Sequence, residues 1–338
     1  AGYLTWQIVA LLLPEPGRSR VPFLLAVVFS AQFFLDNFHH VQMNGVIFVL
    51  TLLGIHAYLR KRDRAAAAYL VSATAIKITP IFFLVWLVIR GPRRAVLALL
   101  PLAIAAILVP LLARGPATGA ADLLEYYSSF LGPQREAEID SYSAGQNLAA
   151  LVTRMTRPVE YVDHRSYRYL PASEGAAQLV SRIGGALVLL VFLLKLLQLR
   201  RQQSEVSPLE ISLVFLAALL LSPITFTHHL VTLLFVFYAF LSARFHRSWA
   251  DRPLMILLAI VMAVIGLSGR DLTGAGVYLA VRGYSLIAWT MLLLFGLAAL
   301  AAGDDPDPPT NPLHSGGGPW LRTPKPLWRT SGRSTRRV

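Results

Sequence analysis

The sequence contains no cysteine and few charged residues. Asp, Glu, Lys and Arg make up 14% of its 338 residues, whereas soluble domains carry about 25%. The lack of cysteine excludes disulfides, cysteine-ligated zinc, iron–sulfur clusters and thiol nucleophiles. Hydrophobic residues make up 55% of the chain, and the mean hydropathy is +0.57. This composition excludes a soluble domain and predicts a polytopic membrane protein.

The positive charge of the chain is concentrated in short clusters. The net charge is +13, from 31 Lys and Arg against 18 Asp and Glu. Most of the basic residues lie between apolar stretches, which is typical of cytoplasmic loops next to an anionic lipid leaflet. We therefore expect membrane lipids, and no nucleic acid, as partners of these residues.

The apolar stretches predict an all-α, polytopic transmembrane helical bundle. A bilayer crossing needs about 20 apolar helical residues. About nine crossings are expected, at 1–13 (partial), 21–35, 41–59, 95–113, 179–199, 209–221, 228–243, 254–267 and 278–302. The chain begins without Met and inside such a stretch, so we expect a further N-terminal segment upstream of it.

The segment 65–89 decides the predicted topology. It is apolar, but it carries Lys77 and the Thr79-Pro80 pair near its middle, and basic clusters flank it at 60–64 and 90–94. The positive-inside rule favours both clusters on the cytoplasmic side. The length of the segment also permits a single crossing. Charge parity favours a re-entrant pair of half-helices, broken at Thr79-Pro80.

This topology divides the rest of the chain. The loop 114–178 has no basic bias and is expected outside the cytoplasm, with short surface helices at 120–131 and 145–156. The end of the chain is rich in Pro, Gly and Arg, a composition typical of disorder. We therefore expect a transmembrane domain at 1–302 and a disordered, basic cytoplasmic tail at 303–338.

Polar residues collect in four short groups: two join neighbouring crossings, one breaks the segment 65–89, and one lies in the long outer loop. The groups are Asp36–Asn44, Ala75–Pro80, Ser143–Leu148 and Ser222–His229. Polar groups inside a membrane are costly unless they are paired or used. Counting the crossings places three of the groups at the outer side of the membrane. The break at Lys77 points from the cytoplasmic side into the membrane interior, toward these three groups. We expect the four groups to converge on one site that faces away from the cytoplasm.

The residue types in these groups suit sugar transfer from a lipid phosphate. A carboxylate or His can accept the proton of an acceptor hydroxyl, and Lys or protonated His can stabilise a leaving phosphate. Amide side chains donate and accept hydrogen bonds, as sugar hydroxyls require. The candidate catalytic residues are Asp36, His228 and His229, and the candidate substrate-binding residues are His39, His40, Gln42, Asn44, Lys77, Gln146 and Asn147.

Each candidate also has a structural alternative. Lys77 can snorkel or bind a backbone carbonyl, Asp36 can cap a helix, and Gln146 and Asn147 can cap a surface helix. Adjacent histidines point about 100° apart on a helix, so at most one of each pair is expected to face the site. Asp36 and the four histidines could ligate a metal, but no HExxH motif or spaced pair supports one. We therefore expect neither a metal nor a cofactor.

Four elements occur in an order and spacing that resemble glycosyltransferase family 87. They are Gln42 and Asn44, the AIKITP run around Lys77, GQNL at 145–148 and SPITFTHH at 222–229. The family patterns are GQxN, AAxKxTP, NQSL and a Ser-Pro element with His-His. The third element here has an altered order, and the resemblance spans most of residues 30–245.

The resemblance implies an integral membrane glycosyltransferase of the GT-C type. Such enzymes transfer a sugar, typically mannose, from a polyprenyl-phosphate donor to a glycan or glycolipid acceptor, with inversion. The expected location is a bacterial plasma membrane, with the active site on the extracytoplasmic side. The resemblance assigns Lys77 and His228 or His229 to the donor phosphate, and the four amide residues to the sugar or acceptor.

Two departures from the family pattern stand out. Val41 occupies the position of the family's Gly before Gln42. The family also places a catalytic Asp in the first outer loop, which is expected upstream of this sequence; if that segment is absent, Asp36 or a His must act as the base. The alternative functions are a transporter or flippase for a lipid-linked or anionic solute and a structural membrane subunit.

Overall fold

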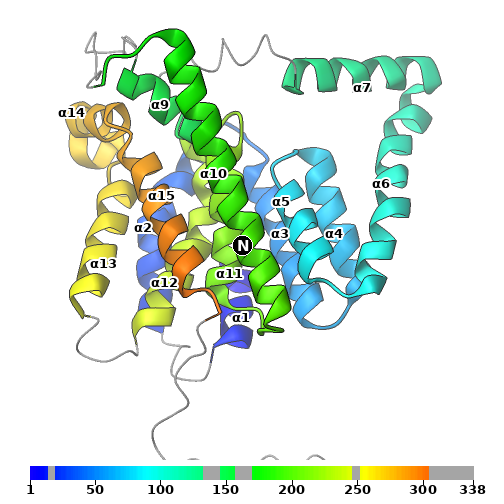
Figure 1. The fold of residues 1–338 in the computed structure, drawn as a ribbon, viewed down its shortest axis with the longest axis horizontal. Coiled ribbons are helices and arrows are strands. Elements are labelled where there is room, and N and C mark those ends of the chain that lie inside the picture. The colour runs from blue at the N-terminus through cyan, green and yellow to red at the C-terminus, as the bar shows by residue number, and fades with distance from the viewer. Residues whose placement is uncertain (14–19, 132–144, 157–169, 246–251, 304–338) are drawn as a thin grey trace, which may run out of the picture. The chain divides into compact units, whose positions relative to one another are not determined.

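The computed structural model describes residues 1–13, 20–131, 145–156, 170–245 and 252–303. All regular elements in these ranges are helices (Figure 1). In chain order they are α1 (Gly2–Leu12), α2 (Arg20–His39), α3 (Asn44–Leu59), α4 (Asp63–Ile76), α5 (Ile81–Arg90), α6 (Arg93–Arg114), α7 (Pro116–Leu131), α9 (Leu148–Thr156), α10 (Glu174–Arg201), α11 (Pro208–Leu221), the 3₁₀ helix η2 (Thr227–Thr232), α12 (Leu233–Phe245), α13 (Arg252–Gly266), α14 (Arg270–Gly283) and α15 (Leu286–Ala301). Apart from Gly303, the predicted tail lies outside the described residues.

The predicted apolar stretches coincide with helices, although 228–243 begins in the 3₁₀ helix η2 before it continues as α12, and 278–302 is divided. The stretch 278–302 is not one helix, because α14 and α15 are separated by Tyr284 and by Ser285, whose φ is 56°. By length and composition, three of the described helices can cross a membrane: α2, α6 and α10. A fourth candidate is the bent pair α13 and α14, which meet at 101°. The other apolar helices have 10–17 residues, so nine crossings stay a prediction.

Helices α11 and α6 show the two extremes of burial. In α11 all residues from Pro208 to Leu220 are buried. A helix that is apolar on all sides belongs in a protein interior or in lipid, and here α10, α12 and α15 pack around it. In α6, Ala95 is the one buried residue, and the helix packs mainly against α4 and α7. Its apolar side chains therefore remain for lipid contact.

Helices α4 and α5 form a hairpin, as predicted for the segment 65–89. The break covers residues 77–80, where Lys77 is extended and Pro80 precedes α5. A residue before proline is disfavoured in the helical conformation, so the sequence ends α4 here. The Tyr58 hydroxyl, near the end of α3, donates a hydrogen bond to the carbonyl of Arg90 at 3.1 Å. Both ends of the hairpin therefore lie at the C-terminal end of α3.

A buried ion pair fixes this end of the bundle. The Arg90 guanidinium contacts the Glu210 carboxylate at 2.9 Å, and Trp86 donates to the same carboxylate at 2.7 Å. Arg90 also donates to the carbonyls of Leu199 and Ser204, at 2.9 and 2.6 Å. These bonds join α5, the end of α10 and the start of α11. We call this region, with its neighbouring clusters at 60–64, 90–94 and 200–201, the basic end.

Helix α2 ends in a turn that matters for the site. Val41 has a φ of 50°, its N–H bonds to the carbonyl of Phe38, and the N–H of Gln42 bonds to the carbonyl of Asn37. This is the Schellman pattern, whose left-handed position is normally glycine. The family's Gly before Gln42 therefore has a physical reason, and Val41 adopts the same turn at a cost in backbone strain.

Candidate functional site

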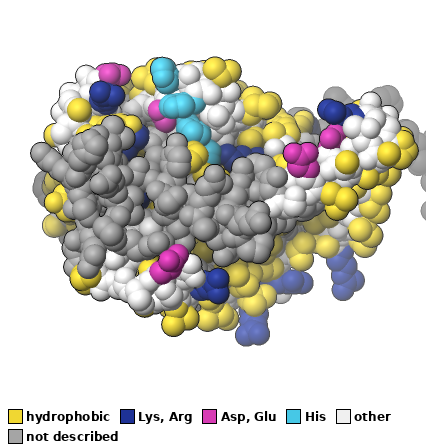
Figure 2. Space-filling model, turned by 90° about the horizontal axis from the view of Figure 1, so that it is seen from above, with side chains coloured by type: hydrophobic (Ala, Val, Ile, Leu, Met, Phe, Trp, Pro, Cys, Tyr) yellow, Lys and Arg dark blue, Asp and Glu magenta, His cyan; other side chains and the backbone are white. Residues whose placement is uncertain are grey.

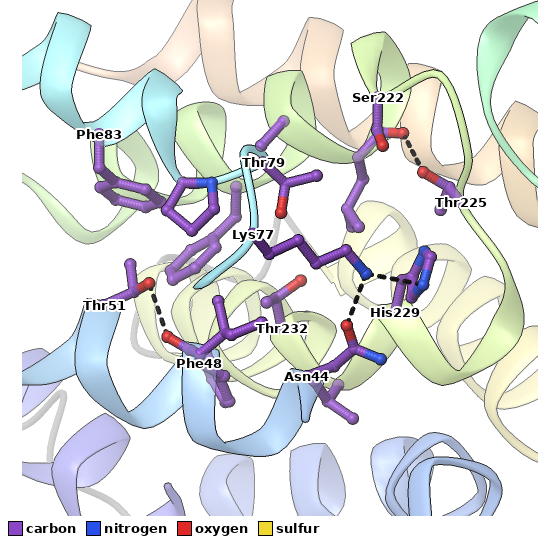
Figure 3. A pocket seen from close by; sticks show the side chains of 16 residues that line it. Asn44, Phe48, Thr51, Lys77, Thr79, Phe83, Ser222, Thr225, His229 and Thr232 are labelled. Carbon is purple, nitrogen blue, oxygen red and sulfur yellow. Dashed lines mark hydrogen bonds between the residues drawn. The ribbon is translucent and has the colours of Figure 1, made fainter. Parts of the chain in front are cut away.

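Three of the predicted polar groups meet at Lys77. Its ammonium Nζ lies 2.8 Å from Asn44 Oδ1 and 2.8 Å from His229 Nε2 (Figure 3). Asn44 begins α3, Lys77 follows α4, and His229 lies in η2. The side chain of Lys77 reaches across the space between these helices. The predicted convergence of Asn44, Lys77 and His229 is thus present in the structure.

Hydrogen bonds hold the His229 ring between Lys77 and the loop before η2. A charged Lys77 can only donate, so Nε2 of His229 accepts from it. Nδ1 lies 3.1 Å from the N–H of Phe226, which donates to it, and 3.1 Å from the carbonyl of Ile224. The loop 222–226 therefore holds the imidazole with its lone pair toward Lys77.

A small cavity lies beside the Lys77 ammonium. Its volume is about 50 Å³, enough for a few water molecules. Polar side chains line one part of it: Asn44, Thr51, Lys77, Thr79, Ser222, Thr225, His229 and Thr232. Apolar side chains line the remainder: Ile47, Phe48, Pro80, Phe83, Phe215, Ala218, Leu219 and Val231. The cavity thus combines one cation with hydroxyl and amide groups on one part of its wall and aromatic and aliphatic side chains on the remainder.

Two polar atoms in the cavity wall have hydrogen-bonding capacity left. Within the described part of the chain, Asn44 Nδ2 and Thr232 Oγ1 are buried and have no hydrogen-bond partner. Asn44 as a whole is 8% exposed. Buried polar groups in proteins are almost always paired. Donors left over next to a lysine are suited to the oxygens of a bound anion.

A second cluster lies next to the first. Asp36 and His40 are one turn apart at the end of α2, and His228 precedes His229 in η2. The Asp36 carboxylate lies 3.5 Å from His40 Nδ1 and 3.9 Å from His228 Nδ1. The rings of His228 and His229 meet edge to face, with centroids 4.5 Å apart. Figure 2 shows histidine side chains gathered along one face of the molecule.

Both histidines of the second pair face polar groups, which corrects one expectation. At most one of each pair was expected at the site. However, η2 runs between the two clusters, so His228 points to Asp36 while His229 points to Lys77. The nearly perpendicular rings, at 88°, reflect this division. In the first pair, His39 is exposed and its ring packs edge to face on His40.

Gln146 and Asn147 lie in the core beside the same loop. Asn147 is 1% exposed, and its Oδ1 accepts from the Ala150 N–H, which caps α9. Its Nδ2 donates to the carbonyls of Ser222 and Pro223, both at 2.7 Å. The Gln146 N–H donates to the carbonyl of Thr225 at 2.6 Å. Asn147 therefore caps a helix, as the structural alternative predicted. It also holds the loop 222–226, which leads into the histidines of η2.

Arg154 is a buried residue that the sequence analysis did not single out. It is 2% exposed and donates to Ser285 Oγ and to the carbonyl of Gly145, at 2.7 and 2.5 Å. It fixes the backbone just before Gln146. A single Arg in the short apolar helix α9 was the available signal. Gln42, in contrast, is exposed at the turn after α2.

Fold and site together define a helical membrane protein with a cationic polar pocket between its helices. The model of glycosyltransferase family 87 matches residues 1–223 of this chain. The chain therefore belongs to glycosyltransferase family 87, and it is a glycosyltransferase. Comparison with curated proteins gives no match, and neither does comparison with solved structures. The family match covers Asp36, Asn44, Lys77 and Asn147 and ends shortly before His228.

Proposed function

We propose that this protein is a GT-C-type glycosyltransferase that transfers a sugar from a polyprenyl-phosphate donor, with mannose as the first candidate sugar. The acceptor is a glycan or glycolipid outside the cytoplasm, and the membrane is a bacterial plasma membrane. Membership of glycosyltransferase family 87 supplies the reaction class. The polar pocket supports the choice of a phosphate-bearing donor.

The observation that carries this proposal is the charge on Lys77. Among the residues that the structure describes, Lys77 contacts an amide and an imidazole but no carboxylate. A cation between packed helices is costly unless an anion compensates it. A phosphate bound in the cavity would provide that compensation, and Lys77 would stabilise the negative charge that develops on the leaving group.

The N-terminus of α3 also favours a bound phosphate. Asn44 is its first residue, and the N-terminus of a helix carries free N–H groups and a partial positive charge. Asn44 Nδ2, which has no partner in the described part of the chain, lies in the same wall. The lysine, the amide and the helix end together form a set of donors for phosphate oxygens.

The second cluster supplies the proton acceptor. In the transfer step, a bond forms between the acceptor oxygen and the anomeric carbon, and the bond from that carbon to the phosphate oxygen breaks. The electron pair leaves with the phosphate, and the hydroxyl proton passes to the Asp36 carboxylate. His228 faces that carboxylate, with its Nδ1 3.9 Å from Asp36 Oδ2. The exposed His39, His40 and Gln42 form the rim that the acceptor approaches.

The test is transfer by the full natural chain in membranes or liposomes. Labelled polyprenyl-phosphate mannose is supplied with candidate glycan and glycolipid acceptors, and nucleotide-linked and diphosphate-linked sugars serve as comparison donors. We expect a product with inverted anomeric configuration from the monophosphate donor. Transfer from a nucleotide sugar, or no transfer from any lipid-phosphate sugar, contradicts the proposal.

A further inference from the structure

We infer that Asp36, His40 and His228 form a binding site for a divalent cation of the zinc class. One donor atom from each residue lies within 4.8 Å of the other two. Two imidazoles and one carboxylate are the ligand set of many zinc sites that keep an open position for a further ligand. The inference concerns the second cluster of the proposed active site, but cation binding itself does not depend on the proposed reaction.

The distances favour an ion between these side chains over direct hydrogen bonds. The separations of 3.5 and 3.9 Å between Asp36 and the two imidazole Nδ1 atoms exceed normal hydrogen-bond lengths. Ligand atoms that surround one tetrahedral zinc lie about 3.4 Å apart, given bond lengths of about 2.0–2.1 Å. The separations of 3.5 Å (His40 Nδ1 to Asp36 Oδ1) and 3.9 Å (His228 Nδ1 to Asp36 Oδ2) are close to that value, and one ligand atom of each residue lies within 4.8 Å of the others. Side-chain rotations can therefore bring the three residues to one centre.

Local structure places all three ligands. Asp36 and His40 share one face of the last turn of α2, and the turn at Val41 ends the helix directly after them. His228 comes from η2, which the loop 222–226 and Asn147 hold in place. The bond from His40 Nδ1 to the carbonyl of Asp36, at 2.9 Å, is dispensable, because that carbonyl already accepts the N–H of His40.

Exposure leaves an open side to the site. The side chain of His228 is 11% exposed, that of Asp36 26% and that of His40 48%. The buried ligand therefore faces the interior and the exposed ligand faces the solvent. A cation held here leaves coordination positions for an oxygen of the incoming acceptor. It would lower the pKa of that hydroxyl, and the second oxygen of Asp36 remains available to take the proton.

The test measures metal binding directly. The purified full chain is stripped with a chelator, Zn²⁺ binding is followed by calorimetry, and Co²⁺ binding is followed by its visible absorption. We expect one ion per chain, and at least a tenfold loss of affinity in His40→Ala, Asp36→Asn and His228→Ala. His39→Ala is the matched control, because it removes the adjacent exposed histidine and should leave binding unchanged.

His40 is exposed, so His40→Ala should fold, and its thermal unfolding checks this. Wild-type affinity in His40→Ala, or equal loss in His39→Ala, overturns the inference. So does the absence of saturable binding. Transfer activity gives a separate readout: zinc binding without any transfer contradicts the proposed function alone, whereas transfer by a chain that binds no cation contradicts the cation site alone.

Discussion

Lys77 Nζ lies 2.8 Å from Nε2 of His229, a residue 152 positions further along the chain. The contact depends on two interruptions of helical structure. The break before Pro80 frees Lys77 from α4, and the loop after α11 turns His229 back toward it. Neither residue lies inside a regular α-helix. These two candidate functional groups thus lie where apolar helices are broken, which is where a membrane bundle can accommodate polar chemistry.

Removal of the Lys77 charge should abolish most of the transfer. Lys77→Met keeps the length of the side chain but cannot stabilise a leaving phosphate, so we expect kcat to fall by about 100-fold or more. Lys77→Arg should retain part of the activity because it keeps the charge. Lys195→Met on α10 is the control for loss of a lysine from the bundle. Activity above half of wild type in Lys77→Met would exclude a role in the reaction.

The buried pair of Arg90 and Glu210 should behave as a unit in stability. Arg90→Met leaves the Glu210 carboxylate buried without its cation, which costs about 3–5 kcal/mol. The double variant Arg90→Met with Glu210→Gln should lose less stability than the sum of its two single variants. Thermal unfolding in detergent measures this, with the exposed Arg94→Met as control. Strictly additive effects would show that the two side chains do not stabilise each other.

Val41→Gly should stabilise the protein. Val41 is 89% exposed and has a φ of 50°, so the substitution removes backbone strain and little packing. The left-handed conformation costs a non-glycine residue about 1–2 kcal/mol, and we expect a net gain of about 1 kcal/mol, seen as a higher unfolding temperature. The control Val46→Gly, on an exposed helical position of α3, should instead destabilise by about 1 kcal/mol. A lower unfolding temperature in Val41→Gly would contradict the strain argument.

The membrane topology can be tested in this cysteine-free chain. Single cysteines at Arg62 and Arg93 should react with an impermeant reagent from the same side of the membrane, because the hairpin returns to the basic end. A cysteine at Val41 should react from the opposite side. All three positions are exposed. Labelling of Arg62→Cys and Arg93→Cys from opposite sides would rule out the re-entrant arrangement.

Much of the helical structure followed from sequence patterns. The apolar stretches, the break before Pro80 and the two short helices in the loop 114–178 correspond to helices or breaks in the structure. The break at Ser285 was not predicted, because no proline marks it. The ion pair of Arg90 and Glu210 was also missed, although a Glu at the start of the apolar stretch 209–221 was a visible signal.

The sequence by itself determined that this is an all-helical membrane protein, and it predicted that Asp36, Lys77 and the histidines carry its polar chemistry. Hydropathy, proline and charge act locally, so they can be read along the chain. The tertiary structure decided the partners: Lys77 with Asn44 and His229, and Asp36 with His40 and His228. It also showed that the Asn147 amide holds the loop. These contacts join distant segments through the packing of several helices, which no local pattern encodes.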